Sequence, residues 1–470
     1  MIRSYVDVMS DAIRCREAWH FCPSAYRCLY GIWSTFCHWR PSYGATHSGE
    51  TPKGTGLGGT GNGRTHDEQF GLPVRATGHA SRRPLRADEL LESALRRGKR
   101  RDFADRSFVR PFEHLLEACN EEADLSSFGV RALRIDLLRC LRNLLRFDAV
   151  EAACPAVLSR PIHAPVFITG MPRSGTTFLH RLILQDPATI APRLFQLVYP
   201  YASQASIGTA LRKKWVSVQL ALFRAIAPEL NALHPVAVDS PEECTDIIAQ
   251  VFQSLRFDAM YRVPSYNSWL GRSGFLGGYR FHRRFLQHLD AQLPSRRWIL
   301  KSPDHIFALP DIRNVYPDAR LVLVHRDPVR VLASVAKLTE VLRRPFARNV
   351  DRIEIGREVS ASWLDGAQRM SELSSNGNSV LHLNYRQIIS SPLDAVRAVY
   401  EHCGLALTGE AEGRMRSWLR ARVNVRRQWR DYKLADFGLD AHLLRERFAH
   451  YTDRFGIEIE YFERPTGAMV

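Results

Sequence analysis

Residues 165–180 constrain the fold of this chain more than any other segment. They begin with a short apolar run over residues 166–169, continue through a loop with Gly170 and Gly175 at its bends, and reach a helix expected to begin near Thr176. A loop of this kind directs backbone N–H groups inward, and the positive end of the helix dipole lies behind them. The segment therefore predicts a strand, a loop and a helix that together bind a phosphate group.

The loop differs from an ordinary nucleotide-binding loop at one position. The spacing from Gly170 to Gly175 matches the pattern G-x-x-x-x-G-K-[ST], except that Thr176 stands where the lysine is expected. That lysine contacts the outer phosphates of ATP or GTP, so its absence argues against a nucleotide triphosphatase. Arg173 lies earlier in the loop, where its planar guanidinium can bind a phosphate from the other side. The alternative is a strand-turn-helix corner without a ligand, but these residues offer many anion donors and little apolar packing.

The overall composition is that of a soluble globular protein. The chain has 470 residues, a formal charge of +16, and no run of about 20 apolar residues that would span a membrane. The charge favours acidic ligands, and a single polyanionic cofactor accounts for a basic site. Because arginine is spread along the chain without a lysine-rich tail, we do not expect nucleic-acid binding. Nine cysteines without a C-x-x-C pair suit reduced thiols in a cytoplasmic protein and fit no usual zinc pattern.

Three regions differ in composition. We predict a disordered leader and linker over residues 1–86, because residues 41–84 are rich in glycine and polar residues and poor in apolar surface. Helical patterns follow, including a leucine stripe between positions 133 and 144, and they predict a helical cap over residues 87–160. The main domain is expected over residues 161–462.

Apolar runs that alternate with helical segments predict the architecture. Runs suited to buried strands occupy residues 298–301, 321–325 and 380–385, in addition to the strand before the loop. Strands that alternate with helices imply a central parallel sheet covered on both faces, which is an α/β, P-loop-like three-layer fold with an N-terminal helical extension. Ligands of such sheets bind at the carboxyl ends of the strands.

These segments, in this order, resemble the sulfotransferases that use 3′-phosphoadenosine 5′-phosphosulfate (PAPS), in particular a bacterial branch with a helical N-terminal extension. The resemblance covers roughly residues 88–460 and includes two signatures. It implies that the loop binds the 5′-phosphosulfate of the donor through Arg173, Ser174, Gly175, Thr176 and Thr177.

The second signature implies a site for the 3′-phosphate. Arg326 at a strand end and Ser334 eight residues later fit the family pattern, and Tyr385 falls where the family often has a tyrosine near the adenine. Two phosphate sites are needed because the donor carries charge at both ends of its ribose. The alternatives are that Arg326 forms only a salt bridge with Asp327, and that Tyr385 ends a buried strand with its hydroxyl in water.

The resemblance also implies the catalytic residues. Lys301 lies in the segment where relatives carry a catalytic lysine, and a fixed ammonium there stabilises the charge that develops on the leaving oxygen. A solvated cap at the strand end is the alternative for this lysine. The acceptor must lose a proton, and His305, His234 and Glu243 are the candidates for the base. Some relatives place a catalytic glutamate shortly after the loop helix, whereas Gln196 in the corresponding region here cannot accept a proton.

We therefore expect an enzyme that transfers a sulfuryl group by in-line displacement from PAPS to a hydroxyl or amine, without a metal ion. The acceptor is expected to be a small molecule, a carbohydrate or a lipid, and an aromatic stretch with Tyr261, Tyr266, Trp269 and Phe275 is a candidate wall of its pocket. Two alternatives stay open. One is a magnesium-dependent P-loop kinase in which Asp327 holds the metal, and the other is a non-catalytic nucleotide-binding module.

Overall fold

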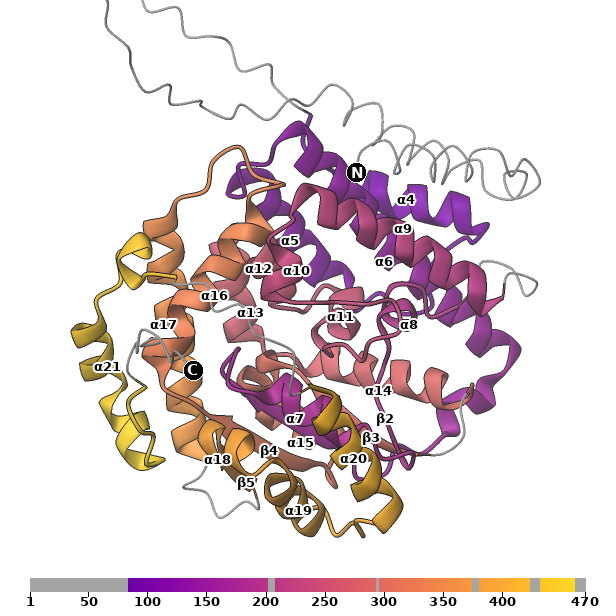
Figure 1. Cartoon of the computed structure of the whole chain (residues 1–470). Coiled ribbons are helices and arrows are strands. Elements are labelled where there is room, and N and C mark those ends of the chain that lie inside the picture. The colour runs from indigo at the N-terminus through magenta and orange to yellow at the C-terminus, as the bar shows by residue number, and fades with distance from the viewer. Residues whose placement is uncertain (1–82, 202–207, 293–295, 374–379, 423–431, 461–470) are drawn as a thin grey trace, which may run out of the picture. The chain divides into compact units, whose positions relative to one another are not determined.

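The structure is a computed structural model that describes residues 83–201, 208–292, 296–373, 380–422 and 432–460 (Figure 1). Most of the predicted leader and linker, residues 1–82, therefore lies outside the described residues. From Leu85 onward the chain forms one compact unit. Within the described ranges, none of the helices combines the length and the apolar character that a membrane crossing requires.

A parallel sheet of five strands lies at the centre of this unit. The strands stand in the order β2-β3-β1-β4-β5, and every neighbouring pair is parallel. Their bounds are β1 Val166–Gly170, β2 Thr189–Ile190, β3 Arg297–Lys301, β4 Arg320–His325 and β5 Val380–Asn384. The four longer strands confirm the predicted ones, whereas β2 was not predicted because two residues give no periodic signal.

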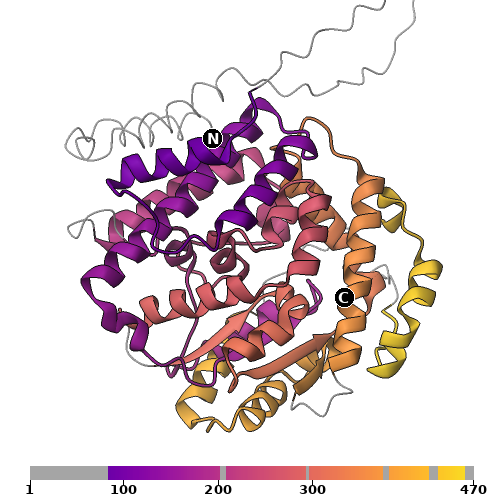
Figure 2. The same cartoon turned by 180° about the vertical axis from the view of Figure 1, so that it is seen from behind.

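Helices cover both faces of the sheet, as the alternation of side chains along β1 shows (Figures 1 and 2). Val166 and Ile168 pack on one side in a cluster formed with helices α7 (Thr176–Ile183), α19 (Pro392–His402) and α20 (Gly409–Arg422). Phe167 points to the other side, where its ring contacts His282 of α14 and Tyr316 after α15. The predicted three-layer α/β architecture is therefore confirmed, and period-two alternation explains how one strand serves two cores.

The N-terminal region is helical, as predicted. It contains α4 Ala87–Gly98, α5 Val109–Glu121 and α6 Ser127–Ala153, followed by the short helix η1 Pro155–Ser159. The Ser126 side chain caps α6 by accepting a hydrogen bond from the Gly129 backbone N–H. The leucine stripe of α6 is buried in the same hydrophobic cluster as Phe167 of the sheet. This region therefore shares one core with the rest of the unit.

The remaining helices connect the strands and continue to the C-terminal side of the sheet. Figure 1 shows α21 lying along the outside of α17, and the two helices are in contact. The bounds before β4 are α7 Thr176–Ile183, α8 Leu194–Val198, α9 Thr209–Ile226, α10 Leu230–Leu233, α11 Thr245–Ile248, η2 Ala249–Val251, α12 Arg256–Met260, α13 Pro264–Ser273, α14 Leu276–Asp290, η3 Pro303–Ala308 and α15 Leu309–Val315. Those after β4 are α16 Pro328–Arg343, α17 Arg352–Leu373, α18 Tyr385–Ser390, α19 Pro392–His402, α20 Gly409–Arg422, η4 Leu434–Phe437 and α21 Ala441–Arg454.

Candidate active site

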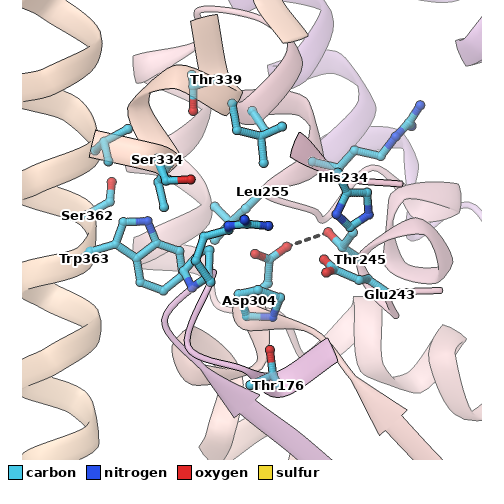
Figure 3. A pocket seen from close by; sticks show the side chains of 18 of the residues that line it. Thr176, His234, Glu243, Thr245, Leu255, Asp304, Ser334, Thr339, Ser362 and Trp363 are labelled. Carbon is cyan, nitrogen blue, oxygen red and sulfur yellow. Dashed lines mark hydrogen bonds between the residues drawn. The ribbon is translucent and has the colours of Figure 1, made fainter. Parts of the chain in front are cut away.

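A cavity of 1340 Å³ opens at the carboxyl ends of the strands. Its walls come from the β1–α7 loop, the segment after α10, the start of α11, η3, α16 and α17. Figure 3 shows residues from these separate elements converging on one space, among them Thr176, His234, Asp304, Ser334 and Trp363. The position agrees with the rule that ligands of parallel α/β sheets bind where the strands end.

The loop after β1 is held tightly between two neighbours, and its two glycines are required for this fit. Gly170 has φ +151°, and a Cβ atom there would lie 2.2 Å from the carbonyl oxygen of Val324 in β4. Gly175 has φ +97°, and a Cβ atom there would lie 3.0 Å from the ring of Tyr385. Only glycine adopts these conformations without strain in so little space. The loop backbone therefore lies directly against both β4 and Tyr385.

The expected residues of the 5′ site differ in how they face the cavity. Arg173, Gly175, Thr176 and Thr177 line it, and α7 begins at Thr176, so the first N–H groups of this helix have no partner inside the helix. Ser174 does not line the cavity: its side chain is buried, and its hydroxyl lacks a hydrogen-bond partner in the described part of the chain. The loop thus offers the helix terminus and backbone donors of an anion site, as expected from sequence.

Arg326 joins the two predicted phosphate-binding segments. Its Nη1 donates a hydrogen bond of 2.6 Å to the carbonyl oxygen of Arg173 in the loop. Its Cζ lies 3.7 Å from the ring centroid of Tyr385. Ser334, on α16, lines the same cavity as these three residues. The segments around Arg173 and Arg326, far apart in sequence, therefore meet at one place on the sheet edge.

The guanidinium of Arg326 forms an ion pair with a carboxylate. Nε and Nη2 donate to the two carboxylate oxygens of Glu460, each at 2.8 Å, in a bidentate ion pair. The alternative predicted partner, Asp327, has other contacts: its oxygens accept from the backbone N–H groups of Val329 and Glu460, each at 2.9 Å. Arg326 thus binds an anion of planar, two-oxygen geometry, which is the recognition expected of arginine at a phosphate site.

The side chain of Arg173 bridges the loop to the segment after α10. Its Nη1 donates a 2.9 Å hydrogen bond to the carbonyl oxygen of Leu233. The next residue, His234, lines the cavity, and its Nε2 lies 3.6 Å from the carboxylate of Glu242. Glu242 itself is buried outside the cavity and accepts from Ser240. His234 is therefore the part of this segment that reaches the site.

Lys301 and Glu243 form a close ion pair at the end of β3. The Nζ of Lys301 lies 2.5 Å from Oε1 of Glu243, the lysine is buried, and only the glutamate lines the cavity. Partial burial acts to raise the pKa of Glu243, but Lys301 and His234 outweigh it, so the pKa lies below the ordinary glutamate value. Lys301 is thus a buried, paired cation and not the solvated cap considered as its alternative.

His305 lies beneath the cavity and does not line it, unlike the other candidate bases. Its Nδ1 lies 2.6 Å from the hydroxyl of Tyr279, and its ring contacts the edge of Phe167 in the core. Burial lowers the pKa of His305 well below the ordinary histidine value, and His282 and Lys301 act in the same direction. The ring is therefore neutral and separated from any acceptor in the cavity. Gln196 is also absent from the lining, because its side chain caps α8 by accepting from the Arg193 backbone N–H.

Two groups of cavity residues were not found from the sequence. One is Asp304, whose carboxylate accepts a 2.5 Å hydrogen bond from Thr245 and lines the cavity. The second is an apolar wall made by Leu255, Met260, Phe307 and Trp363. These residues come from segments that only the fold brings together, so no local pattern marks them. Of the four aromatic residues expected to line a pocket, Phe275 does so and Trp269 does not, whereas Tyr261 and Tyr266 are buried in the core.

The comparison with known proteins decides the family. The sequence profile described as the sulfotransferase family matches residues 165–409, just over half of the chain. The chain belongs to the sulfotransferase family. The match includes all the site residues predicted for this sulfotransferase, from Arg173 to Tyr385, whereas Glu460 lies beyond it. The enzyme is thus a transferase, and the kinase and non-catalytic alternatives are not favoured.

Mycobacterial sulfotransferases are similar in sequence and in structure. The omega-hydroxy-beta-dihydromenaquinone-9 sulfotransferase Stf3 of Mycobacterium tuberculosis is 24% identical over 307 residues, which are 63% of this chain and 75% of Stf3. The crystal structure of STF1 from M. tuberculosis has a TM-score of 0.68 at 29% identity and covers 78% of this chain and 99% of STF1. STF9 from Mycobacterium avium has a TM-score of 0.71 at 28% identity, with coverage of 80% and 97%. These likenesses support the P-loop-like fold of the sulfotransferase.

Proposed function

We propose that this sulfotransferase uses PAPS as its donor and binds it across the junction of the two signature segments. The 5′-phosphosulfate lies against the loop and the start of α7, and the 3′-phosphate binds Arg326 and Ser334. The observation that carries this proposal is the hydrogen bond from Arg326 to the carbonyl oxygen of Arg173, which brings the two anion sites into one cavity. The fit is supported by Arg326 itself, because its guanidinium holds a carboxylate in bidentate fashion.

Tyr385 is proposed to contact the donor from the side of β5. Its ring lies close to Gly175 of the loop and to the guanidinium of Arg326, so it is near both proposed anion sites. A ring in this position supports an aromatic contact with a nucleotide. Ser174 is proposed to contribute to the 5′ site through its loop backbone, since its buried side chain does not line the cavity.

The ion pair of Lys301 and Glu243 is proposed to supply charge close to the loop. Lys301 pairs through its backbone with Ile168 of β1, the strand that leads into the phosphate loop, and Glu243 holds its ammonium. A preorganised cation near a departing phosphate stabilises the transition state. Glu243 fixes this ammonium and faces the cavity together with His234. Because its pKa is lowered, Glu243 is a weak proton acceptor, and we do not propose His305 as the base because it lies outside the cavity.

A lipophilic alcohol is the acceptor class that the cavity supports best. Leu255, Met260, Phe307 and Trp363 form an apolar wall, and the cavity volume of 1340 Å³ exceeds what a nucleotide donor alone would fill. The name of the relative Stf3 states that its acceptor is a hydroxylated menaquinone, which is a lipid. We therefore propose a lipid or isoprenoid hydroxyl as acceptor, in a cytoplasmic reaction that needs no metal.

Two measurements test this function. Titration calorimetry with 3′-phosphoadenosine 5′-phosphate (PAP) should show binding to the wild type, and Arg326→Ala should weaken it by about 2 to 4 kcal/mol, because a charged contact is lost in a partly buried site. Equal affinities would show that the 3′ site lies elsewhere. Arg330→Ala, in the first turn of α16, is the matched control for a lost cationic side chain in the cavity wall.

The acceptor is tested with PAPS that carries labelled sulfur. We expect label to pass to farnesol, an isoprenoid primary alcohol, more efficiently than to glucosamine, a polar acceptor of similar size. EDTA should leave the rate unchanged, whereas a magnesium-dependent kinase would stop. Transfer to glucosamine alone would overturn the proposed acceptor class.

A further inference from the structure

Asp304 is a carboxylate that lines the cavity near the carboxyl end of β3. It is the second residue of η3, three positions after the end of β3, and the carbonyl oxygen of the neighbouring Pro303 accepts a 3.2 Å hydrogen bond from the Thr169 hydroxyl near the end of β1. Asp304 is thus attached to the strand that leads into the phosphate loop. In Figure 3 it stands in the middle of the labelled side chains, with Glu243 and His234 on one side and Ser334 and Trp363 on the other. Its carboxylate therefore faces the part of the cavity that lies between the donor loop and the apolar wall.

A short hydrogen-bond network fixes the orientation of this carboxylate. Thr245 donates its hydroxyl proton to Oδ2 of Asp304 at 2.5 Å. Ser254 holds Thr245 in turn, because its hydroxyl donates to the Thr245 carbonyl oxygen at 2.9 Å and lies 2.9 Å from the Thr245 hydroxyl. The Asp304 backbone is fixed by its own N–H, which donates to Ser302. Asp304 is therefore preorganised by two neutral hydroxyl groups that themselves have little freedom.

The other carboxylates of the cavity wall are engaged differently. Five of them form ion pairs with basic side chains: Glu243 with Lys301, Asp246 with Arg256, Asp258 and Glu358 with Arg343, and Asp365 with Arg369. Asp311 accepts from the backbone N–H of Phe275. Ion pairing stabilises the charged form of a carboxylate and makes it a weaker base. Burial opposes this effect: it raises the pKa of Asp246, and it raises the pKa of Asp258 to about 6. Asp304 differs from both because it accepts from a neutral hydroxyl, that of Thr245.

We propose that Asp304 is the general base of the transfer, the catalytic residue that accepts the proton of the acceptor hydroxyl. This inference rests on the proposed function of the cavity. The acceptor oxygen forms its bond to sulfur as the bond between sulfur and the bridging phosphate oxygen breaks. The electron pair of that bond stays on the phosphate, the hydroxyl proton passes to Asp304, and the proton then leaves to solvent. The products are a sulfate monoester and PAP, and no oxidant or reductant takes part.

The charges around Asp304 support this role. Desolvation raises the pKa of the Asp304 carboxyl most, and Glu243, Asp246 and Asp258 raise it further, while the Thr245 hydrogen bond lowers it; the result is about 7. A general base works best when its pKa lies near the working pH. Glu243 has a pKa below the ordinary value because of Lys301. The two neighbouring carboxylates therefore have opposite properties, one fixed as an ion-pair partner and one able to exchange a proton.

The test compares Asp304→Asn with Asp186→Asn. Asp186 is a buried carboxylate outside the cavity, and it also accepts from a hydroxyl, that of Tyr400 at 2.7 Å. With labelled PAPS and farnesol, Asp304→Asn should lower kcat at least about 100-fold, the usual contribution of a general base. PAP affinity should stay within about threefold, and Asp186→Asn should retain wild-type kcat. Unchanged kcat in Asp304→Asn with normal folding would overturn the proposal.

The pH profile separates Asp304 from a purely structural residue. The wild-type rate should rise with pH through about 7 and then level off, because the base must be ionised. Thr245→Val removes the hydrogen bond that lowers this pKa, so it should move the rise to higher pH, whereas Thr245→Ser should leave it in place. The rise should persist in His234→Gln. Its loss in His234→Gln, or its persistence in Asp304→Asn, would assign the proton to His234 instead.

Two further outcomes distinguish a failure of the donor site from a failure of the acceptor class. If PAP does not bind the wild type, the donor proposal fails. If the wild type transfers the labelled sulfuryl group to water and not to farnesol, the acceptor class is wrong. The role of Asp304 is then measured in this hydrolysis, which also requires removal of a proton. A normal water reaction in Asp304→Asn would then count against Asp304.

Discussion

Replacing Glu460 by glutamine should make the sulfotransferase bind PAP more tightly. Glu460 occupies the Arg326 guanidinium with two hydrogen bonds of 2.8 Å. A donor phosphate that binds Arg326 must therefore displace this carboxylate. Glutamine keeps the size of the side chain and removes its charge, so it should leave Arg326 open to the 3′-phosphate for a larger fraction of the time.

The magnitude follows from the exposure of the pair. The side chains of Arg326 and Glu460 are 9% and 17% exposed, so their interaction exceeds that of a surface pair, for which about 0 to 1 kcal/mol is typical. A net value of about 1 to 2 kcal/mol is consistent with a charged hydrogen bond in a partly buried place. The apparent dissociation constant is the intrinsic one divided by the open fraction. Glu460→Gln should thus tighten PAP binding about 5- to 30-fold.

Calorimetry on matched variants checks this expectation. Glu458→Gln is the control, because Glu458 lies two residues away and pairs with Arg386 at the surface, where the two side chains are 65% and 58% exposed. It should bind PAP within about twofold of the wild type. The gain from Glu460→Gln should vanish in an Arg326→Ala background, where nothing remains to be released. Unchanged or weaker binding by Glu460→Gln would refute the idea that Glu460 and the donor compete for Arg326.

Two further predictions concern the supports of the site. Gly175→Ala should lower the free energy of unfolding by about 1 to 3 kcal/mol and weaken PAP binding, because φ is +97° there and the new methyl group would contact the Tyr385 ring. Denaturant titration measures the first effect and calorimetry the second. A stable variant with normal affinity would contradict the tight fit. Lys301→Met should cost about 3 to 5 kcal/mol at neutral pH by leaving Glu243 unpaired. The folded-state pKa of Glu243 is lowered, so the stabilisation is present above the ordinary value of 4.5 and is lost as the pH falls through the folded value. The deficit of Lys301→Met should therefore shrink in acid, and a deficit independent of pH would show that lost packing causes it.

Short-range signals were enough to predict much of the fold. The apolar run before Gly170 and the runs ending at Lys301 and His325 are strands in the structure, and helices between them require parallel pairing. The leucine stripe between residues 133 and 144 is a buried face of α6. Strand order and the two-residue strand β2 were not predicted, because pairing of strands depends on contacts between distant segments.

The part of the candidate site that lies in short sequence motifs was also predictable. Arg173 lies in a loop whose neighbouring residues indicate anion binding, and Arg326 fits a signature of the family that the sequence resembles, so both could be named before their positions were known. His305 shows where this reasoning fails: it lies next to Asp304 in the sequence, yet it packs against Tyr279 while Asp304 faces the cavity. Which of two adjacent side chains enters a site depends on the direction of the backbone in η3 and on the neighbours that fill the core.

The sequence by itself determined the anion-binding loop and the alternation of strands and helices, because these depend on backbone geometry and on periods of a few residues, and the family resemblance added Arg326. Only the tertiary structure decided that Arg326 reaches the loop carbonyl and holds Glu460, and that Lys301 is buried against Glu243. It also decided that Asp304 accepts a hydrogen bond from the neutral hydroxyl of Thr245. The physical reason is that charge, burial and basicity depend on atoms a few ångströms away in space, and most of those atoms belong to residues 50 or more positions away in the chain.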